Sequence, residues 1–244
     1  MPLSALKRSQ PVPLSPVVWG WFPPLLALIV VSAKALSPAV YQRFIFGEQG
    51  LTEQLTALIG LLAVYLGVRV LLLARQQLPI LEVLWLGVAT LGCVYLAGEE
   101  VSWGQQLVHW QTSETFAALN HQRESNLHNM SSWLNQKPRI LLELWVLVGG
   151  IALPVWRCLR NKPLRPVAGF AYWFWPGREC LPTALLAIFI LFPKRYRQLF
   201  ELPGLLVEVH WSELQEYYFA LFLALYLAVI LRRLQGAPSV VAGR

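Results

Sequence analysis

Apolar and polar residues follow one another along this chain in long blocks, not in the short alternation of a strand-rich domain. Six apolar blocks stand out, most of them close to the roughly 20 residues that an α-helix needs to cross a bilayer. The pattern predicts an all-α polytopic helical membrane bundle of about six transmembrane helices. The blocks are residues 17–36, 55–74, 79–98, 139–157, 180–193 and 214–231.

The fifth block is the shortest of the six. Residues 180–193 hold roughly fourteen apolar positions, with Pro182 near the start. A block of this length fits a tilted helix, a re-entrant element or an interfacial segment. Whether it crosses decides which side of the membrane receives the polar residues that open the sixth block.

The blocks divide the chain into a tail (1–16), a single transmembrane domain (17–231) and a second tail (232–244). Lys7 and Arg8 precede the first block, which continues without a convincing cleavage site, so we expect it to be retained as a span. With both termini cytoplasmic, more Lys and Arg fall inside than outside. We expect a multi-pass protein of a bacterial-type inner membrane.

Composition supports the membrane assignment. The chain is 56% hydrophobic and only 14% charged, whereas soluble domains carry about 25% charged residues. The formal net charge of +7 has a membrane explanation, so we expect lipids and no nucleic acid as partners. Under the same topology all four His and most Glu fall on the outer side. Carboxylates do not set orientation, so this segregation needs another explanation.

The most polar stretch, GEEVSWGQ (98–105), directly follows the third block. Glu99 and Glu100 can be solvated carboxylates at a helix end, where charge costs far less than in the bilayer centre. Alternatively they form an acid/base pair, because neighbouring carboxyl groups push each other's proton affinities apart. In that interpretation Trp103 is a wall facing the substrate, and Gln105 is a further substrate-binding residue.

Residues 112–130 predict an amphipathic helix on the outer side, within a polar loop and helix that extend over 99–138. His121, Glu124 and His128 gather on one face, and an apolar stripe occupies the opposite face. The helix can lie on the membrane surface with its His and Glu in water. It can also cover a cavity, with Glu124 and His128 as catalytic residues and Asn126 and Asn129 as substrate-binding residues.

Metal binding is a further interpretation of the same residues. Glu124 and His128, together with His210 and Glu213 at the start of the sixth block, could supply ligands for a divalent metal. Di-metal sites in helical bundles use Glu-x-x-His, however, and here the order is His-x-x-Glu. A metal-free acid/base site is therefore equally open, and the cofactor is left undefined.

Arg195 belongs to a cluster of cations that this topology places outside, against the usual bias. The cluster can bind a phosphate or a lipid headgroup. It can also form an interfacial collar whose long side chains reach toward water.

Two blocks of the sequence resemble a motif of an uncharacterised family of bacterial multi-spanning membrane proteins, G-E-E-[IV]-S-W-G-Q followed by N-x-Q-x-E-x-N-L-H-N. His121 is not part of that pattern, so the resemblance favours Glu124 with His128. It implies no activity, only that the outer polar layer is the part to test. The matching positions are Gly98, Glu99, Glu100, Val101, Ser102, Trp103, Gly104 and Gln105, then Asn120, Gln122, Glu124, Asn126, Leu127, His128 and Asn129.

Three functions are compatible with these patterns. The first is an enzyme, metal-assisted or not, whose outer Glu/His pocket acts on a lipid-linked or membrane-embedded substrate. The second is a non-enzymatic accessory or assembly subunit that binds a partner membrane protein. The third, a proton-coupled transporter, is disfavoured because Glu143 is the one ionisable group well inside a span, one turn from Arg139.

Overall fold

The computed structural model describes residues 14–45, 50–108, 110, 132–161, 169–200 and 209–236. These residues form helices and turns, with no β-strand among them. Six helical segments are long and apolar enough to cross a membrane, which confirms the predicted all-α membrane bundle. The predicted helix at 112–130 lies outside the described residues. The six segments are Val17–Leu36, Leu51–Gln77, Ile80–Glu100, Lys137–Leu159, Phe170–Tyr196 and Trp211–Gly236.

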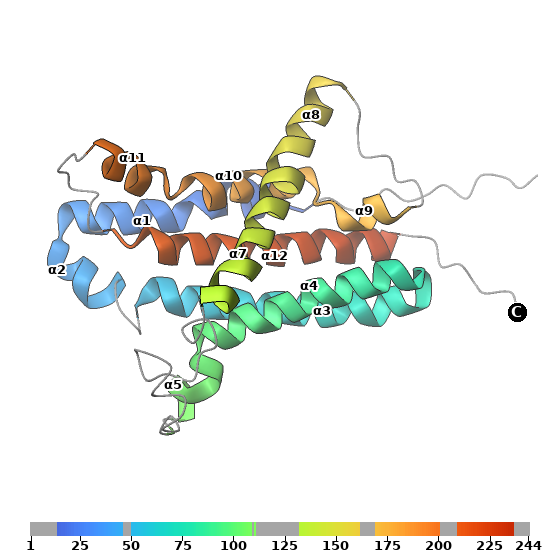
Figure 1. The fold of residues 1–244 in the computed structure, drawn as a ribbon, viewed down its shortest axis with the longest axis horizontal. Helices are drawn as coiled ribbons and strands as arrows, with labels where there is room; N and C mark the ends of the chain where they lie inside the picture. The colour runs from blue at the N-terminus through green and yellow to red at the C-terminus, as the bar shows by residue number, and fades with distance from the viewer. Residues whose placement is uncertain are drawn as a thin grey trace, which may run out of the picture.

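Helix α12 (Trp211–Gly236) is the core of the bundle (Figure 1). In the most apolar 18-residue stretch of α12, 83% of the residues are buried, whereas the same share for the Lys137–Leu159 segment is 17%. Helix α12 is apolar all round, as expected for a helix enclosed by others. It packs most extensively against α3 (Leu51–Gln77) and against α10 (Leu181–Phe189).

Helix α3 pairs with α4 (Ile80–Glu100) through small residues. A Cβ added at Gly60 would lie 3.0 Å from the Ala97 Cβ. One added at Gly67 would lie 2.6–3.0 Å from the side-chain atoms of Thr90. Such contacts let two backbones approach closely, which is how helices associate where lipid removes the hydrophobic driving force.

The first span combines a π-helical turn, Val17–Trp21, with α1 (Phe22–Leu36). A short α2 (Pro38–Val40) and a second π-helical turn, Tyr41–Ile45, follow it. Tyr218 of α12 donates a hydrogen bond to the Pro23 carbonyl (2.9 Å), which ties the first span to the core.

The fifth segment is a broken helix that runs the length of the bundle, and Phe170–Tyr196 is long and apolar enough to cross a membrane. It consists of α9 (Phe170–Phe174), the 3₁₀ turn Arg178–Cys180, α10 and α11 (Phe192–Phe200). In Figure 1, α9 lies near the end of the bundle at which α12 finishes, and α11 lies near the end at which α12 begins. Residues before the apolar block therefore belong to the same candidate span.

The fourth segment crosses the bundle steeply (Figure 1). It is one continuous rod of α7 (Ser132–Trp145), a π-helical stretch Val146–Ala152, and α8 (Leu153–Leu159). Over residues 137–159 its buried residues are Val146, Gly149 and Gly150. A Cβ on Gly150 would lie 2.7 Å from Ala184 and 2.8 Å from Phe222, so the rod touches the bundle closely at this point.

The two ends of the bundle differ in chemistry. At one end α3 and α12 begin and α4 and α11 finish, and we call this the polar end. A 3₁₀ turn, Ser102–Gly104, and a short α5 (Gln105–Val108) follow α4 there. The start of the first span and the finish of α12 lie toward the opposite end (Figure 1).

Replacing Gly67 by Val should destabilise the bundle, because the added methyl groups overlap Thr90. Overpacking of this kind costs about 1–3 kcal/mol. Gly87, on α4, is the matched control, because a Cβ there meets nothing within 4 Å. Thermal unfolding in detergent should show a lower midpoint for Gly67→Val and an unchanged one for Gly87→Val. Equal midpoints for both variants would contradict the close contact between Gly67 of α3 and Thr90 of α4.

Candidate functional site

The steep crossing of α7 leaves a groove between α7 and α4, with α12 as its floor. The groove encloses about 500 Å³. Ala89, Gly92 and Leu96 of α4 and Leu142 of α7 line its middle, together with Phe219 of α12. Most of this lining is apolar, as is usual for pockets that hold a large organic ligand.

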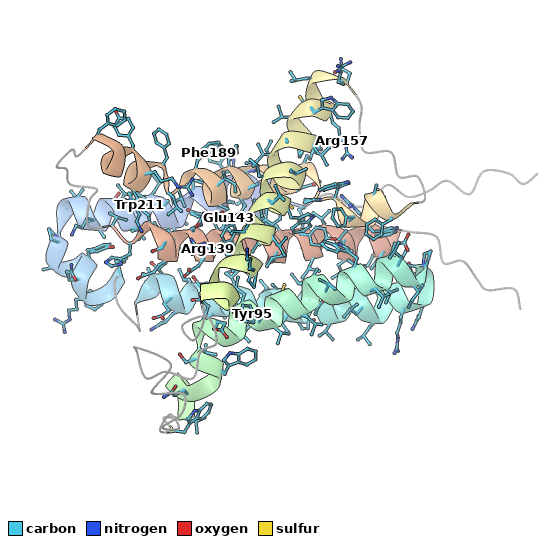
Figure 2. The ribbon with its side chains drawn as sticks, viewed as in Figure 1. Tyr95, Arg139, Glu143, Arg157, Phe189 and Trp211 are labelled. Atoms are coloured by element: carbon cyan, nitrogen blue, oxygen red, sulfur yellow. The ribbon has the colours of Figure 1, made fainter. Side chains whose placement is uncertain are left out.

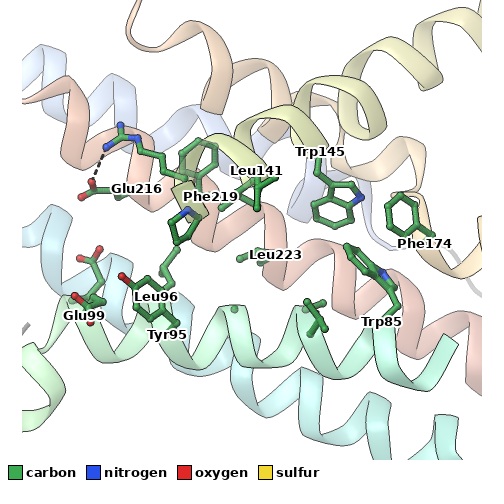
Figure 3. Close-up of a pocket in the computed structure, with 17 residues that line it drawn as sticks. Trp85, Tyr95, Leu96, Glu99, Leu141, Trp145, Phe174, Glu216, Phe219 and Leu223 are labelled. Carbon is green, nitrogen blue, oxygen red and sulfur yellow. Dashed lines mark hydrogen bonds and ion pairs between the residues drawn. The ribbon is translucent and has the colours of Figure 1, made fainter. Parts of the chain in front are cut away.

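Aromatic side chains close the groove toward the end of the bundle opposite to the polar end (Figure 3). The ring centroids of Trp85 and Phe174 are 4.3 Å apart, and those of Trp85 and Trp145 are 5.5 Å apart with an edge-to-face orientation. Trp85 Nε1 donates to the hydroxyl of Tyr226 (2.8 Å), which in turn donates to the Trp173 carbonyl (2.6 Å). These bonds fix the aromatic cluster in place.

The groove is open along one side. Val88 and Leu141, on its two rims, are 60% and 68% exposed. The groove is therefore accessible from the side of the bundle, between these two rims. Glu99 lies fourteen residues beyond Trp85 on α4, which corresponds to about 21 Å at the helical rise. The groove thus covers much of a hydrocarbon core that is about 30 Å thick.

Carboxyl groups form the polar end of the groove. Glu99 and Glu100 of α4 and Glu216 of α12 line it there, together with Arg139, and Figure 3 shows Glu99 and Glu216 at the end opposite to Trp85. Glu99 is only 7% exposed. The carboxyl group of Glu100 interacts electrostatically with those of Glu53, Glu99, Glu213 and Glu216. Three helices, α3, α4 and α12, therefore bring their acids to one place.

A tight turn after α4 orients Glu99. The backbone reverses at Ser102, Trp103 and Gly104, which have φ values of 45°, 54° and 97°. The Trp103 indole consequently folds back over the helix, and its Nε1 donates to Glu99 Oε1 at 2.6 Å. The ring packs on Gly98, where a Cβ would lie 3.0 Å from three ring carbons. Gly98 therefore provides the space that the indole needs to reach Glu99.

The turn is strained as well as tight. Left-handed backbone costs non-glycine residues such as Ser102 and Trp103 about 1–3 kcal/mol each. Ser102 is completely buried, and the Gly104 N–H donates to the Val101 carbonyl (2.8 Å). Strain of this kind persists where the surroundings over-determine the conformation, and it gathers at functional sites.

Arg139 on α7 joins the opposite wall of the groove to α12 (Figure 2). Its guanidinium lies 3.4 Å from the carboxylate of Glu143, one turn further on, and 3.4 Å from that of Glu216. It also donates to Gln215 Oε1, while Gln215 Nε2 donates to the Ala187 carbonyl (2.9 Å). The network connects α7, α12 and α10 at the mouth of the groove.

His210 and Glu213 form a second polar group beside these acids. His210 Nδ1 lies 3.5 Å from Glu213 Oε1, and the backbone N–H of His210 donates to the Tyr41 hydroxyl (3.1 Å). Burial lowers the pKa of His210 below its ordinary value, and the charges of Lys194 and Lys34 lower it further. This shift favours the neutral imidazole, which is the form that binds metals. Within the described part of the chain, however, no three His, Cys or acidic side chains gather closely enough to hold a metal ion.

The residues predicted from sequence fall into three groups. Glu99, Glu100 and Glu213 come together at the polar end, with His210 beside them. Trp103 does not line the groove and contacts Glu99 instead, so its contact with a substrate stays a prediction. The rest lie elsewhere or outside the described residues: Gln105 donates to the Trp110 carbonyl (3.2 Å), Arg195 is exposed on α11, and Glu124, Asn126, His128 and Asn129 are not described.

The sequence predicts neither the groove nor two of the side chains at its polar end, Arg139 and Glu216. Arg139 and Glu143 were noted only as a pair one turn apart, and their partner Glu216 is far away in the sequence. The signal that was present is the position of Trp85 and Trp145, which lie inside spans. Tryptophan in spanning helices gathers at membrane interfaces, so a Trp further inside indicates an internal contact.

The bond between Trp103 and Glu99 should stabilise the end of α4. We expect Trp103→Phe and Glu99→Gln each to lower the thermal midpoint in detergent, because each weakens a hydrogen bond to a carboxylate. Hydrogen bonds to charged groups contribute about 1.5–3 kcal/mol, so the double variant should lose less than the sum of the two single losses. Strict additivity would contradict a direct interaction.

The chain was compared with protein families, curated proteins and solved structures. No family model, curated protein or solved structure matches it. Its function is therefore argued from the groove and from the side chains at the polar end.

Proposed function

We propose that this protein is a membrane enzyme that acts, through carboxyl groups at the polar end, on a lipid-linked or membrane-embedded substrate. The observation that supports this most is the groove itself: about 500 Å³ with an apolar body and three carboxyl groups at one end. An amphiphilic molecule is likewise divided into an apolar chain and a polar headgroup. Its chain fits the apolar body, and its reactive headgroup then lies beside Glu99 and Glu100.

The two adjacent carboxyl groups suit acid/base chemistry. Glu99 is buried and accepts the hydrogen bond of Trp103, whereas Glu100 is half-buried and lies among other acids. Carboxyl groups in different surroundings can hold one proton between them, so that one donates while the other accepts. In this proposal Glu99 is the oriented proton acceptor and Glu100 the proton donor.

Glu124 and His128 are proposed as relay residues or metal ligands that complete the site. The described chain stops at Trp110 and resumes at Ser132, the start of α7. His210 and Glu213 supply an imidazole and a carboxylate 3.5 Å apart, which is half of a divalent-metal site with the ordinary ligand types. The metal itself stays part of the proposal.

A non-enzymatic accessory subunit is the second candidate. It is favoured by the low burial of residues 137–159, whose exposed side chains include Leu144, Leu147 and Trp156. A helix of a partner membrane protein could pack along this rod. The carboxyl groups would then form a structural network, and their replacement would lower accumulation of the protein instead of stopping a reaction.

The enzyme proposal predicts a change in cellular lipids. In cells that produce equal amounts of each protein, lipid mass spectrometry should reveal a species that the wild type consumes or makes. Glu100→Gln should slow this change by about 10²–10⁴-fold, the usual contribution of a general acid or base. Glu82→Gln, at the other end of α4, should keep the wild-type rate.

The groove can be tested separately from the carboxyl groups. Gly92 lines it and a Cβ there meets nothing within 4 Å, so Gly92→Phe adds a ring to the α4 wall of the groove. Gly87, on the same helix, is equally open but does not line the groove. The lipid change should disappear in Gly92→Phe and persist in Gly87→Phe. A lipid profile that none of the four variants alters would refute the enzyme proposal.

We also propose that the protein lies in a bacterial inner membrane with its polar end outside and both termini in the cytoplasm, as the Lys and Arg distribution favours. Gln54, exposed in the first turn of α3 at the polar end, and Gln76, exposed at the other end of the same helix, offer a direct test in a variant whose exposed Cys158 is replaced by Ser. A membrane-impermeant maleimide should label Gln54→Cys in intact cells. It should label Gln76→Cys only after the membrane is opened. The reverse pattern would invert the orientation.

A further inference from the structure

The choice of lipid should be made at the polar end of the groove. The acyl chain of a lipid that moves from the bilayer into an apolar groove exchanges one hydrocarbon environment for another. It therefore gains little hydrophobic free energy. The aromatic cluster at Trp85, Trp145 and Phe174 limits how far the chain can go, but every long chain offers the same methylene groups. Discrimination between lipids therefore depends on the side chains that meet the headgroup.

These side chains are unevenly charged across the groove. On the α7 wall the charge of Arg139 is already compensated by Glu143 and Glu216, each 3.4 Å away. On the α4 wall Glu99 and Glu100 line the groove, and the carboxyl group of Glu100 interacts electrostatically with those of Glu53 and Glu213. The α4 wall is thus an acidic surface, and the α7 wall carries a guanidinium.

We infer that the groove selects a phospholipid that carries a primary ammonium group, of the phosphoethanolamine type. This inference rests on the proposed function. The ammonium donates hydrogen bonds to the carboxylate of Glu99 and to the carbonyl oxygen of the Glu100 carboxyl group, and the phosphate replaces Glu216 as the partner of the Arg139 guanidinium. One chain lies in the groove between α4 and α7, and the other stays in the bilayer beyond the open side at Val88 and Leu141.

Each part of this headgroup meets its chemical complement. A primary ammonium has three N–H donors, and carboxylates accept charge-assisted hydrogen bonds from it. A choline headgroup has the same charge but no N–H, and a glycerol headgroup leaves the lipid with the net charge of its phosphate, which the α4 wall repels. The planar guanidinium of Arg139 matches phosphate oxygens in a bidentate manner.

Native mass spectrometry of the detergent-purified protein tests the inference. The probes are phosphatidylethanolamine, phosphatidylcholine and phosphatidylglycerol with identical chains, added in equal amounts. We expect the wild type to retain phosphatidylethanolamine about tenfold more than phosphatidylglycerol, with phosphatidylcholine between them; one decade corresponds to about 1.4 kcal/mol. Glu99→Gln should narrow this preference, because it removes the carboxylate that faces the ammonium, and the double variant Glu99→Gln/Glu100→Gln should abolish it.

Groove variants separate the two proposals. Gly92→Phe should reduce retention of all three lipids alike, whereas Gly87→Phe should retain them as the wild type does. If Gly92→Phe reduces retention but the wild type binds all three lipids equally, or prefers phosphatidylglycerol, the headgroup inference is wrong and the groove stands. If Gly92→Phe changes nothing, the groove proposal fails as well. The thermal midpoint of each groove variant should match that of the wild type. A match shows that a loss of binding is not caused by unfolding.

Discussion

Inside a bilayer, apolar side chains gain almost nothing by leaving lipid for protein, so helices are held by close contact between backbones and by polar bonds. In this protein the decisive contact is made at Gly149 and Gly150, where the fourth segment rests on Trp175, Ala184 and Phe222. Because the contact is short, the rest of the segment can diverge from the bundle. The divergence on one side opens the groove, which would be filled by side chains if α7 lay parallel to α4.

The polar end follows from the same constraint. Carboxylates in mid-bilayer are costly, so Glu53, Glu99, Glu213 and Glu216 can be kept only near the end of a span. The alternating direction of the helices brings the starts of α3 and α12 and the end of α4 to a common level. Arg139 and the Trp103 indole then supply the hydrogen bonds that buried carboxylates require. The segregation of acids noted in the sequence thus has a structural counterpart: they meet in space.

The spans could be read from sequence because block length is a direct consequence of bilayer thickness. The predicted spans at residues 79–98 and 139–157 correspond to the helical segments Ile80–Glu100 and Lys137–Leu159 of the structure. The fifth span was underestimated, because its first part, Phe170–Phe174, is aromatic and resembles an interfacial anchor, yet Trp173 is 8% exposed and packs within the bundle. The groove could not be read at all. It depends on a crossing angle, which is set by contacts between Gly150 and residues far away along the chain.

The central position of α12 has a consequence for how the protein is made. Five spans leave the ribosome before the helix that most of them surround. About 110 residues separate the end of α4 from the start of α12, which is a delay of roughly 5–20 s at ordinary rates of synthesis. During that interval α3 and α4 can pack against each other through Gly60 and Gly67, but α12, the main partner of α3, has not yet been made. The α3–α4 pair can therefore form first, and the bundle is completed only when α12 inserts.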